Sequence, residues 1–153
     1  MDKVQQLGAD PGFLLSRVGA AIRAGFHEVL GRWKIRPLQY VILLVLETAD
    51  GLSQQELCLA AGIDSGNMVE LLDGLEALRY ASRARDPRDR RRHLVTITPR
   101  GRSALAELGV AVREHTSAFL APLTESEREQ LTETLSKLYA ASGGQSPDAP
   151  RLR

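Results

Sequence analysis

The sequence predicts a mainly α-helical fold that carries one small β-hairpin. Over most of the 153 residues, apolar side chains recur every three or four positions, which is the spacing of amphipathic helices. Two short stretches, 80–85 and 93–98, are typical of strands instead, and in the second Val95 and Ile97 alternate with threonines. Hydrophobic residues make up 43% of the chain and aromatic residues only 5%, so the core should be mostly leucine, valine, isoleucine and alanine. The length suits a single domain.

The first two predicted helices are long and strongly apolar. Asp10 and Pro11 favour a helix start, because an aspartate cap precedes proline at the first helical position. This helix should span about six turns and reach residues 33–36. Its apolar stripe is expected at Leu15, Val18, Ile22, Phe26, Val29 and Trp33. Pro37 opens a second helix, 38–49, which is apolar on nearly all sides and should therefore be central and buried.

Two shorter helices follow, with a glycine turn between them. Ser53 and Glu56 match a capping box, which predicts a third helix over 54–61 ended by Gly62. Asp64 and Ser65 are both suitable caps for a fourth helix, which reaches about residue 79. This arrangement is that of a helix-turn-helix. The buried stripe of the fourth helix is expected at Met68, Leu71, Leu72, Leu75 and Leu78, and its outward residues are Ser65, Gly66, Asn67, Glu70, Asp73 and Gly74.

A very basic turn, residues 86–92, joins the two strands. Asp86-Pro87 favours a turn, because proline restricts φ and aspartate bonds locally to backbone amides. Nine arginines against two aspartates give residues 79–102 a local charge of +7, so the rest of the chain carries −6 to reach the formal net charge of +1. By itself such a turn is often only a solvated charged loop. Next to a helix-turn-helix, however, arginines at a hairpin tip suit a narrow negative groove of DNA.

Two more helices complete the ordered chain. Thr98-Pro99 caps the fifth, whose seam should pack against another long helix at Leu105, Leu108, Val112, His115 and Phe119. Pro122 breaks it, and a capping box at Thr124 and Glu127 opens a sixth helix. Residues 143–153 are expected to form a flexible tail. The elements together predict one domain over 10–142, in which a winged helix-turn-helix is flanked by long N- and C-terminal helices.

Three stretches of the chain carry a resemblance to a known family, namely Leu52-Ser53-Gln54-Gln55-Glu56-Leu57, Leu71-Leu72-Asp73-Gly74-Leu75-Glu76, and Asp86-Pro87-Arg88-Asp89-Arg90-Arg91 continued by Leu94-Val95-Thr96-Ile97-Thr98-Pro99-Arg100-Gly101. In these stretches the sequence resembles the multiple antibiotic resistance regulator (MarR) family of bacterial transcription factors. The resemblance implies a homodimer paired through helices 10–35 and 99–141, with winged lobes at 37–98 that straddle double-stranded DNA at a palindromic operator. It also implies repression that a small phenolic or anionic ligand relieves. Gly66, Asn67, Glu70 and Arg36 depart from the residues usual in the family, which bears on the operator sequence.

Several residues are candidates for contact with DNA. By resemblance, Arg90 and Arg91 form the wing tip, with Arg91 the preferred residue for the minor groove, Asp89 stabilising the wing and Arg88 on a phosphate. Asn67 suits bidentate recognition of adenine, Glu70 can accept from cytosine, and Gly66 permits close approach of the backbone. Ser53 and Gln54 lie at a helix N-terminus, which favours phosphate, and Ser65 lies in the first turn of the fourth helix, where a recognition helix meets base edges. The alternatives are an exposed helix position for Asn67 and Glu70, and helix capping alone for Ser53.

An effector site is implied only by the resemblance, between the winged lobe and the long helices. Arg17 or Arg23 could hold an anion, and Trp33 and Tyr40 could stack on a ring. For each of the four residues, a core or salt-bridge role is the competing interpretation. The sequence does not identify the ligand.

Other functions find little support in the sequence. Cys58 is expected to be a buried core residue, and the three histidines lack metal-ligand spacing, so neither a metal nor a cofactor is predicted. The sequence contains neither a phosphate-binding loop nor a nucleophile elbow, so no enzyme is predicted. A signal peptide and a membrane-spanning run are also missing, which led us to expect a cytoplasmic protein without membrane association. A winged helix that binds another protein remains the alternative, with the basic wing as a charged rim.

Overall fold

The computed structural model describes residues 8–86, 89 and 93–142 of the chain. Within these ranges it contains six helices and one two-stranded antiparallel sheet, in the order α2 (Pro11–Gly31), α3 (Pro37–Glu47), α4 (Gln54–Ala61), α5 (Ser65–Ala77), β1 (Ala81–Arg85), β2 (His93–Ile97), α6 (Pro99–Phe119) and α7 (Glu125–Ala141). The predicted mainly α-helical class with a small hairpin is therefore confirmed. The predicted flexible tail, 143–153, lies outside the described residues.

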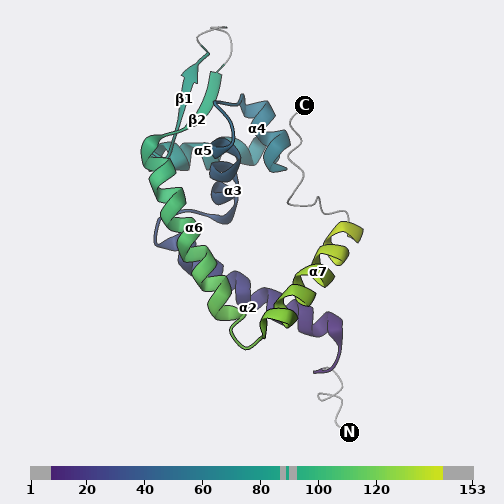
Figure 1. Cartoon of the computed structure of the whole chain (residues 1–153). Coiled ribbons are helices and arrows are strands. Elements are labelled where there is room, and N and C mark those ends of the chain that lie inside the picture. The colour runs from purple at the N-terminus through teal and green to yellow at the C-terminus, as the bar shows by residue number, and fades with distance from the viewer. Residues whose placement is uncertain (1–7, 87–88, 90–92, 143–153) are drawn as a thin grey trace.

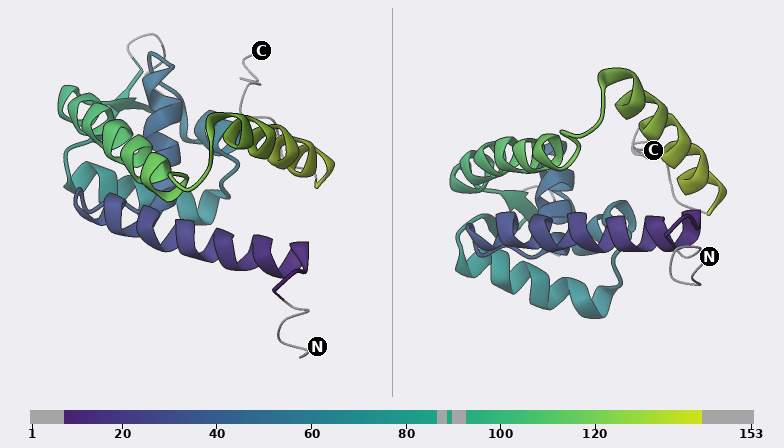
Figure 2. Two further views of the ribbon diagram at one scale, coloured as in Figure 1. Left: turned by 60° about the horizontal axis from the view of Figure 1, so that its bottom comes forward. Right: turned by 90° about the horizontal axis from the view of Figure 1, so that it is seen from below.

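The helices form a winged lobe and a pair of long helices that leads away from it. Figure 1 shows the hairpin at one end of the molecule, with α3, α4 and α5 beneath it. Helix α6 runs from the hairpin to the opposite end, where it packs along α2, and α7 then turns back as a separate arm. The right view of Figure 2 shows the same separation between α7 and the winged lobe. The hairpin and the α7 arm are therefore left open to other molecules.

The core lies where α3 meets its neighbours. Every helix from α2 to α6 contributes to the largest fully buried side chains, which are Leu30, Ile42, Leu43, Leu46, Leu57, Met68, Leu72, Leu75, Leu108 and Val95. Each such side chain contributes about 1.5–3 kcal/mol through burial. Helix α3 is central but is not buried on all sides as predicted, because Leu38 and Leu44 are 46% and 40% exposed. One face of α3 packs on the lobe, and these two side chains lie on its outer side.

Several helices begin at the capping residues that the sequence predicted, and local hydrogen bonds form each cap. The Ser53 N–H donates to Glu56 Oε2 at 2.8 Å, and the Glu56 N–H donates to Ser53 Oγ at 3.2 Å. Thr124 and Glu127 make the equivalent pair of bonds at the start of α7. Asp10 caps α2 by accepting from the backbone three residues later, at 2.8 Å. Each cap satisfies amides that the first helical turn leaves without a partner.

The hairpin is joined to the start of α4. Its register runs from Ala81 opposite Ile97 to Arg85 opposite His93. In addition, Leu52 forms an isolated bridge with Val95, with the Leu52 N–H donating to the Val95 carbonyl at 3.1 Å and the Val95 N–H to the Leu52 carbonyl at 2.7 Å. This bridge ties the hairpin to the residues that precede α4.

The predicted seam of α6 packs against α2. Leu105 and Leu108 are buried, and the seam continues to His115, whose Nε2 lies 3.2 Å from the Ile22 carbonyl oxygen. A Cβ on Gly25 would lie 2.2 Å from the His115 ring, so glycine is needed where the two helices approach. The prediction that this seam meets another long helix is confirmed.

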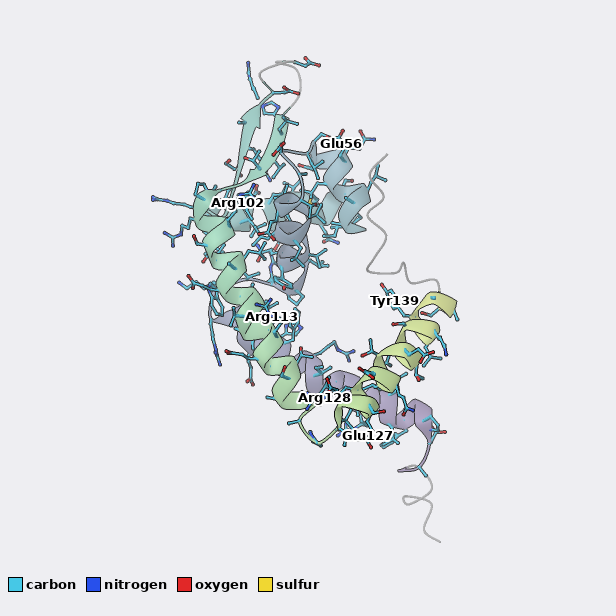
Figure 3. The ribbon with its side chains drawn as sticks, viewed as in Figure 1. Glu56, Arg102, Arg113, Glu127, Arg128 and Tyr139 are labelled. Carbon is cyan, nitrogen blue, oxygen red and sulfur yellow. The ribbon has the colours of Figure 1, made fainter. Side chains whose placement is uncertain are left out.

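The remaining faces of α2 and α7 are open. Seven large apolar side chains on these helices are between 39% and 53% exposed, and we call them the apolar arm face: Phe13, Leu14, Leu15, Val18, Leu135, Leu138 and Tyr139. No residue of α7, which the structure describes in full, is buried. A hollow of about 700 Å³ separates Leu15 from α7, and Figure 3 shows Tyr139 near the end of that arm. Among the described residues, no helix has the length and apolar content to cross a membrane.

Candidate nucleic-acid interface

The N-terminal turn of α5 is exposed and made of small and polar residues. Ser65, Gly66 and Asn67 all face solvent, as predicted for a recognition helix. The cap is Asp64 rather than Ser65: Asp64 Oδ1 accepts the Asn67 N–H at 3.0 Å, and Asp64 Oδ2 accepts from Asn67 Nδ2 at 2.6 Å. These bonds from the backbone and side chain of Asn67 hold the pKa of Asp64 below its ordinary value. The carboxylate is therefore ionised at neutral pH.

Glu70, one turn further along α5, is held by an arginine from another helix. Its Oε1 lies 3.0 Å from Nη2 of Arg36, the residue that precedes α3. Both side chains are well exposed, at 73% for Glu70 and 55% for Arg36, so the pair contributes little to stability. It does lower the negative charge that α5 presents toward a nucleic acid. Contact of Glu70 with cytosine stays a prediction, and it would require this ion pair to open.

Arg83 of β1 connects the hairpin to α5. Its Nη1 lies 2.7 Å from Asp73 Oδ1 and 3.0 Å from Glu76 Oε2, and its Nη2 donates to the Val69 carbonyl at 3.2 Å. The Arg83 backbone N–H also donates to Glu76 Oε1 at 2.9 Å. This role of Arg83 was not predicted from the sequence. The signal was a charged residue on the inward side of β1, opposite Val95, together with two acidic residues three apart on the helix before it.

Gly74 packs inward, which corrects the prediction that it faces outward. The side chain of Gln39, which is only 3% exposed, donates from Nε2 to the Leu71 carbonyl of α5 at 3.0 Å. A Cβ on Gly74 would lie 2.5 Å from that Nε2. Gln39 Oε1 also accepts the Arg36 N–H at 2.9 Å. One buried amide thus joins α3 to α5, and the glycine lets it approach.

At the start of α4, Ser53, one of the two predicted phosphate-binding residues, already has a structural partner. Ser53 and Gln54 are half-buried, and the Ser53 hydroxyl donates to Glu56 Oε2 at 2.7 Å. Capping explains Ser53 by itself, and a phosphate contact from either residue stays a prediction. The predicted wing-tip residues Arg88, Arg90 and Arg91 lie outside the described residues. Asp89 is exposed, and its pairing with a neighbouring arginine stays a prediction.

The four predicted effector residues do not all lie together in the folded structure. Tyr40 is half-buried and contacts the ring of Phe26 edge to face, at 5.9 Å between centroids. Arg23 lies one turn before Phe26 on α2, whereas Arg17 lies roughly 14 Å of helical rise before it. Trp33 is half-buried and packs on the core. The hollow beside Leu15 is lined by none of the four residues.

The titratable groups suggest no other chemistry. Cys58 is half-buried rather than fully buried, and burial, followed by the nearby Asp64 carboxylate, raises the pKa of its thiol. A thiol with a raised pKa is a poor nucleophile. Among the described histidine, cysteine and acidic residues, no group of three could hold a metal ion.

Comparison with known proteins gives a consistent result. Residues 33–92 match the family model described as MarR family. The putative transcriptional regulatory protein for the hcr operon of Thauera aromatica is 33% identical over 134 residues, covering 87% of this chain and 81% of that protein. The solved structure of the transcriptional repressor CouR bound to a 23-mer DNA duplex has a TM-score of 0.75 and 29% identity, covering 90% of this chain and 98% of that one. Bordetella bronchiseptica BpsR, whose DNA binding is regulated by 6-hydroxynicotinic acid, has a TM-score of 0.69 and 28% identity, over 85% and 93%.

Proposed function

This chain belongs to the MarR family of DNA-binding transcriptional regulators, and from that premise we propose that it acts as a homodimeric repressor. As a member of a family of regulators, it is not an enzyme. In the proposed complex, each copy inserts α5 into the major groove of a palindromic operator, and each wing reaches the minor groove beside it. The exposed N-terminal turn of α5 carries the proposal, because Ser65, Gly66 and Asn67 leave the helix free to approach base edges.

Pairing of two copies is supported by the apolar arm face. Soluble monomers rarely leave so many neighbouring apolar side chains in water. A two-fold axis would lay the same helices of a second copy against this face, so that each protomer fills the hollow beside Leu15 of the other. The pairing would also set the two α5 helices about 34 Å apart, which is one turn of DNA.

A charge in the apolar arm face tests the pairing. In light scattering, the double variant Leu15→Glu with Leu138→Glu is expected to have the mass of a single chain, 16.8 kDa, and the wild type is expected to have twice that mass. Leu59→Glu is the matched control, because Leu59 is 80% exposed on α4, outside the apolar arm face. A double variant that keeps the dimer mass would contradict the proposed interface.

DNA docking is tested with duplexes selected from a random pool. Arg91→Ala is expected to weaken binding at every salt concentration, because it removes the proposed minor-groove contact. Arg88→Ala should reduce the slope of log affinity against log salt by about 0.9, as expected for one lost phosphate contact. Arg113→Ala is the control, since Arg113 lies in the second half of α6, below the winged lobe (Figure 3). Unchanged affinity of Arg91→Ala would remove that residue from the proposal, and a wild type that binds no duplex would favour the protein-binding alternative.

We propose further that a small aromatic or anionic ligand releases the operator. The BpsR comparison supports a ligand of this class. We propose that it binds near Phe26, where the residues expected to hold it come from both α2 and α3. There the ring of Tyr40 lies against α2, with Arg23 one turn away. Hydroxylated aromatic acids titrated into the protein–DNA complex should release DNA, and Arg23→Ala should require more ligand than Arg17→Ala. If both variants need the same ligand concentration to release DNA, the ligand does not bind beside Arg23.

A further inference from the structure

The capping aspartate of α5 fixes the orientation of a neighbouring amide. Asp64 Oδ2 lies 2.6 Å from Nδ2 of Asn67, while Asp64 Oδ1 accepts the backbone N–H of the same residue at 3.0 Å. A carboxylate has no hydrogen to donate, so the amide atom that faces it must be the nitrogen and not the carbonyl oxygen. The Asn67 side chain is therefore held in one of its two possible orientations.

This orientation leaves a specific pattern on the exposed side of the amide. An amide nitrogen carries two hydrogens, and Asp64 uses one of them. The second N–H and the carbonyl Oδ1 remain, so the amide still has one donor and one acceptor to offer. In the major groove adenine presents N7 as an acceptor and N6 as a donor, which complement this pattern, whereas guanine presents two acceptors, N7 and O6.

Given the proposed insertion of α5 into the major groove, on which this inference rests, we propose that Asp64 is a positioning residue that orients Asn67 to read adenine. Asp64 need not touch the DNA. It acts through Asn67, by deciding which atoms of the amide are offered to the base.

The surroundings of the pair support this assignment. Glu70, the acidic residue one turn further along α5, is held by Arg36 at 3.0 Å and does not compete for the amide. A Cβ on Gly66 would lie only 3.2 Å from Asp64 Oδ1, so the glycine leaves room for the carboxylate. The lowered pKa of Asp64 keeps it an acceptor at neutral pH.

The experiment measures base preference rather than affinity alone. A duplex selected by the wild type is varied to all four bases at each position of one half-site, and binding is compared between variants. Asn67→Ala identifies the position that Asn67 reads, as the one where discrimination is lost. At that position the wild type should prefer adenine over guanine by roughly ten- to a hundredfold, the range for one bidentate contact.

Asp64→Asn then tests the positioning role, because asparagine caps a helix about as well as aspartate. The new amide donates to Asn67 Oδ1, which turns Asn67 and leaves its two N–H groups outward, so preference at that position should move from adenine to guanine. Asp64→Ser keeps a helix cap but does not hold the Asn67 side-chain amide. It should reduce the preference for adenine over guanine without changing which base is preferred. If Asp64→Asn does not fold, a serine variant with undiminished adenine preference overturns the inference by itself.

The outcomes separate the two proposals. A wild type that selects no duplex refutes the proposed function, and this inference with it. If the wild type binds DNA but Asn67→Ala loses base discrimination at no position, the proposal that Asn67 recognises adenine is overturned. The same holds if the wild type prefers a base other than adenine at the position where Asn67→Ala loses discrimination. Retained adenine preference in Asp64→Asn overturns the positioning role and leaves the proposed function intact.

Discussion

Replacing Arg83 with methionine removes the guanidinium that joins β1 to α5 and keeps most of the aliphatic side chain. Three contacts are lost, to Asp73 at 2.7 Å, to Glu76 at 3.0 Å and to the Val69 carbonyl at 3.2 Å. The Arg83 backbone N–H still donates to Glu76 Oε1, so that carboxylate keeps one bond. The wing should remain attached to the lobe, but less firmly.

The magnitude of the effect follows from exposure. Glu76 is 33% exposed and Arg83 28%, so their contact should contribute about 1 kcal/mol, below the full value of a charged hydrogen bond. Asp73 is 59% exposed, and its contact should contribute about 0.5 kcal/mol. The bond to the Val69 carbonyl adds a further ~0.5 kcal/mol. Arg83 Nε is buried without a hydrogen-bond partner among the described residues, so its removal offsets part of the loss. We expect the free energy of unfolding to fall by about 1–2 kcal/mol.

Urea unfolding at one fixed protomer concentration measures this change, because pairing of copies makes stability depend on concentration. Double-mutant cycles with Glu76→Gln and Asp73→Asn give the two coupling energies. The coupling to Glu76 should be the larger, and the coupling to Asp73 should weaken more in high salt. A larger coupling to Asp73, or an Arg83→Met variant as stable as the wild type, would refute the reasoning from exposure.

Three further predictions concern packing and capping. A Cβ at Gly101 would clash with the Tyr80 carbonyl oxygen, so Gly101→Ala should lower the thermal midpoint by several degrees, as for an overpacking cost of about 1–3 kcal/mol. Gly31→Ala is the control, because a Cβ at Gly31 would meet nothing within 4 Å. Equal midpoints for the two variants would contradict this prediction. Gln39→Leu should lower the urea-unfolding free energy by about 1–2 kcal/mol, because its amide bonds both α3 and α5, and an unchanged value would argue against that link. Bonds from the start of α7 lower the pKa of Glu127, so its stabilisation is present above the ordinary glutamate pKa and lost as pH falls through the lowered value. Glu127→Gln should flatten the acid limb of stability measured by circular dichroism, and an unchanged limb would exclude this cap as its cause.

The sequence by itself determined the elements and their order. Caps such as Ser53 with Glu56, and Thr124 with Glu127, join residues three apart, so their geometry follows from the helix they begin. Periodicity likewise placed the seam of α6, because the apolar stripe of an amphipathic helix follows directly from its residue spacing. The class of fold and the location of the recognition helix followed from these local rules.

Only the tertiary structure decided which side chains from different elements meet. Arg36 reaches Glu70, Arg83 reaches Asp73 and Glu76, and Gln39 fits over Gly74. These contacts depend on how the helices cross and on which rotamers the packing allows, neither of which is encoded in the spacing along one segment. The fourth helix was predicted to carry reading residues on its outer face. For Glu70, the competing contact comes from Arg36, which only the folded chain brings within 3.0 Å of it.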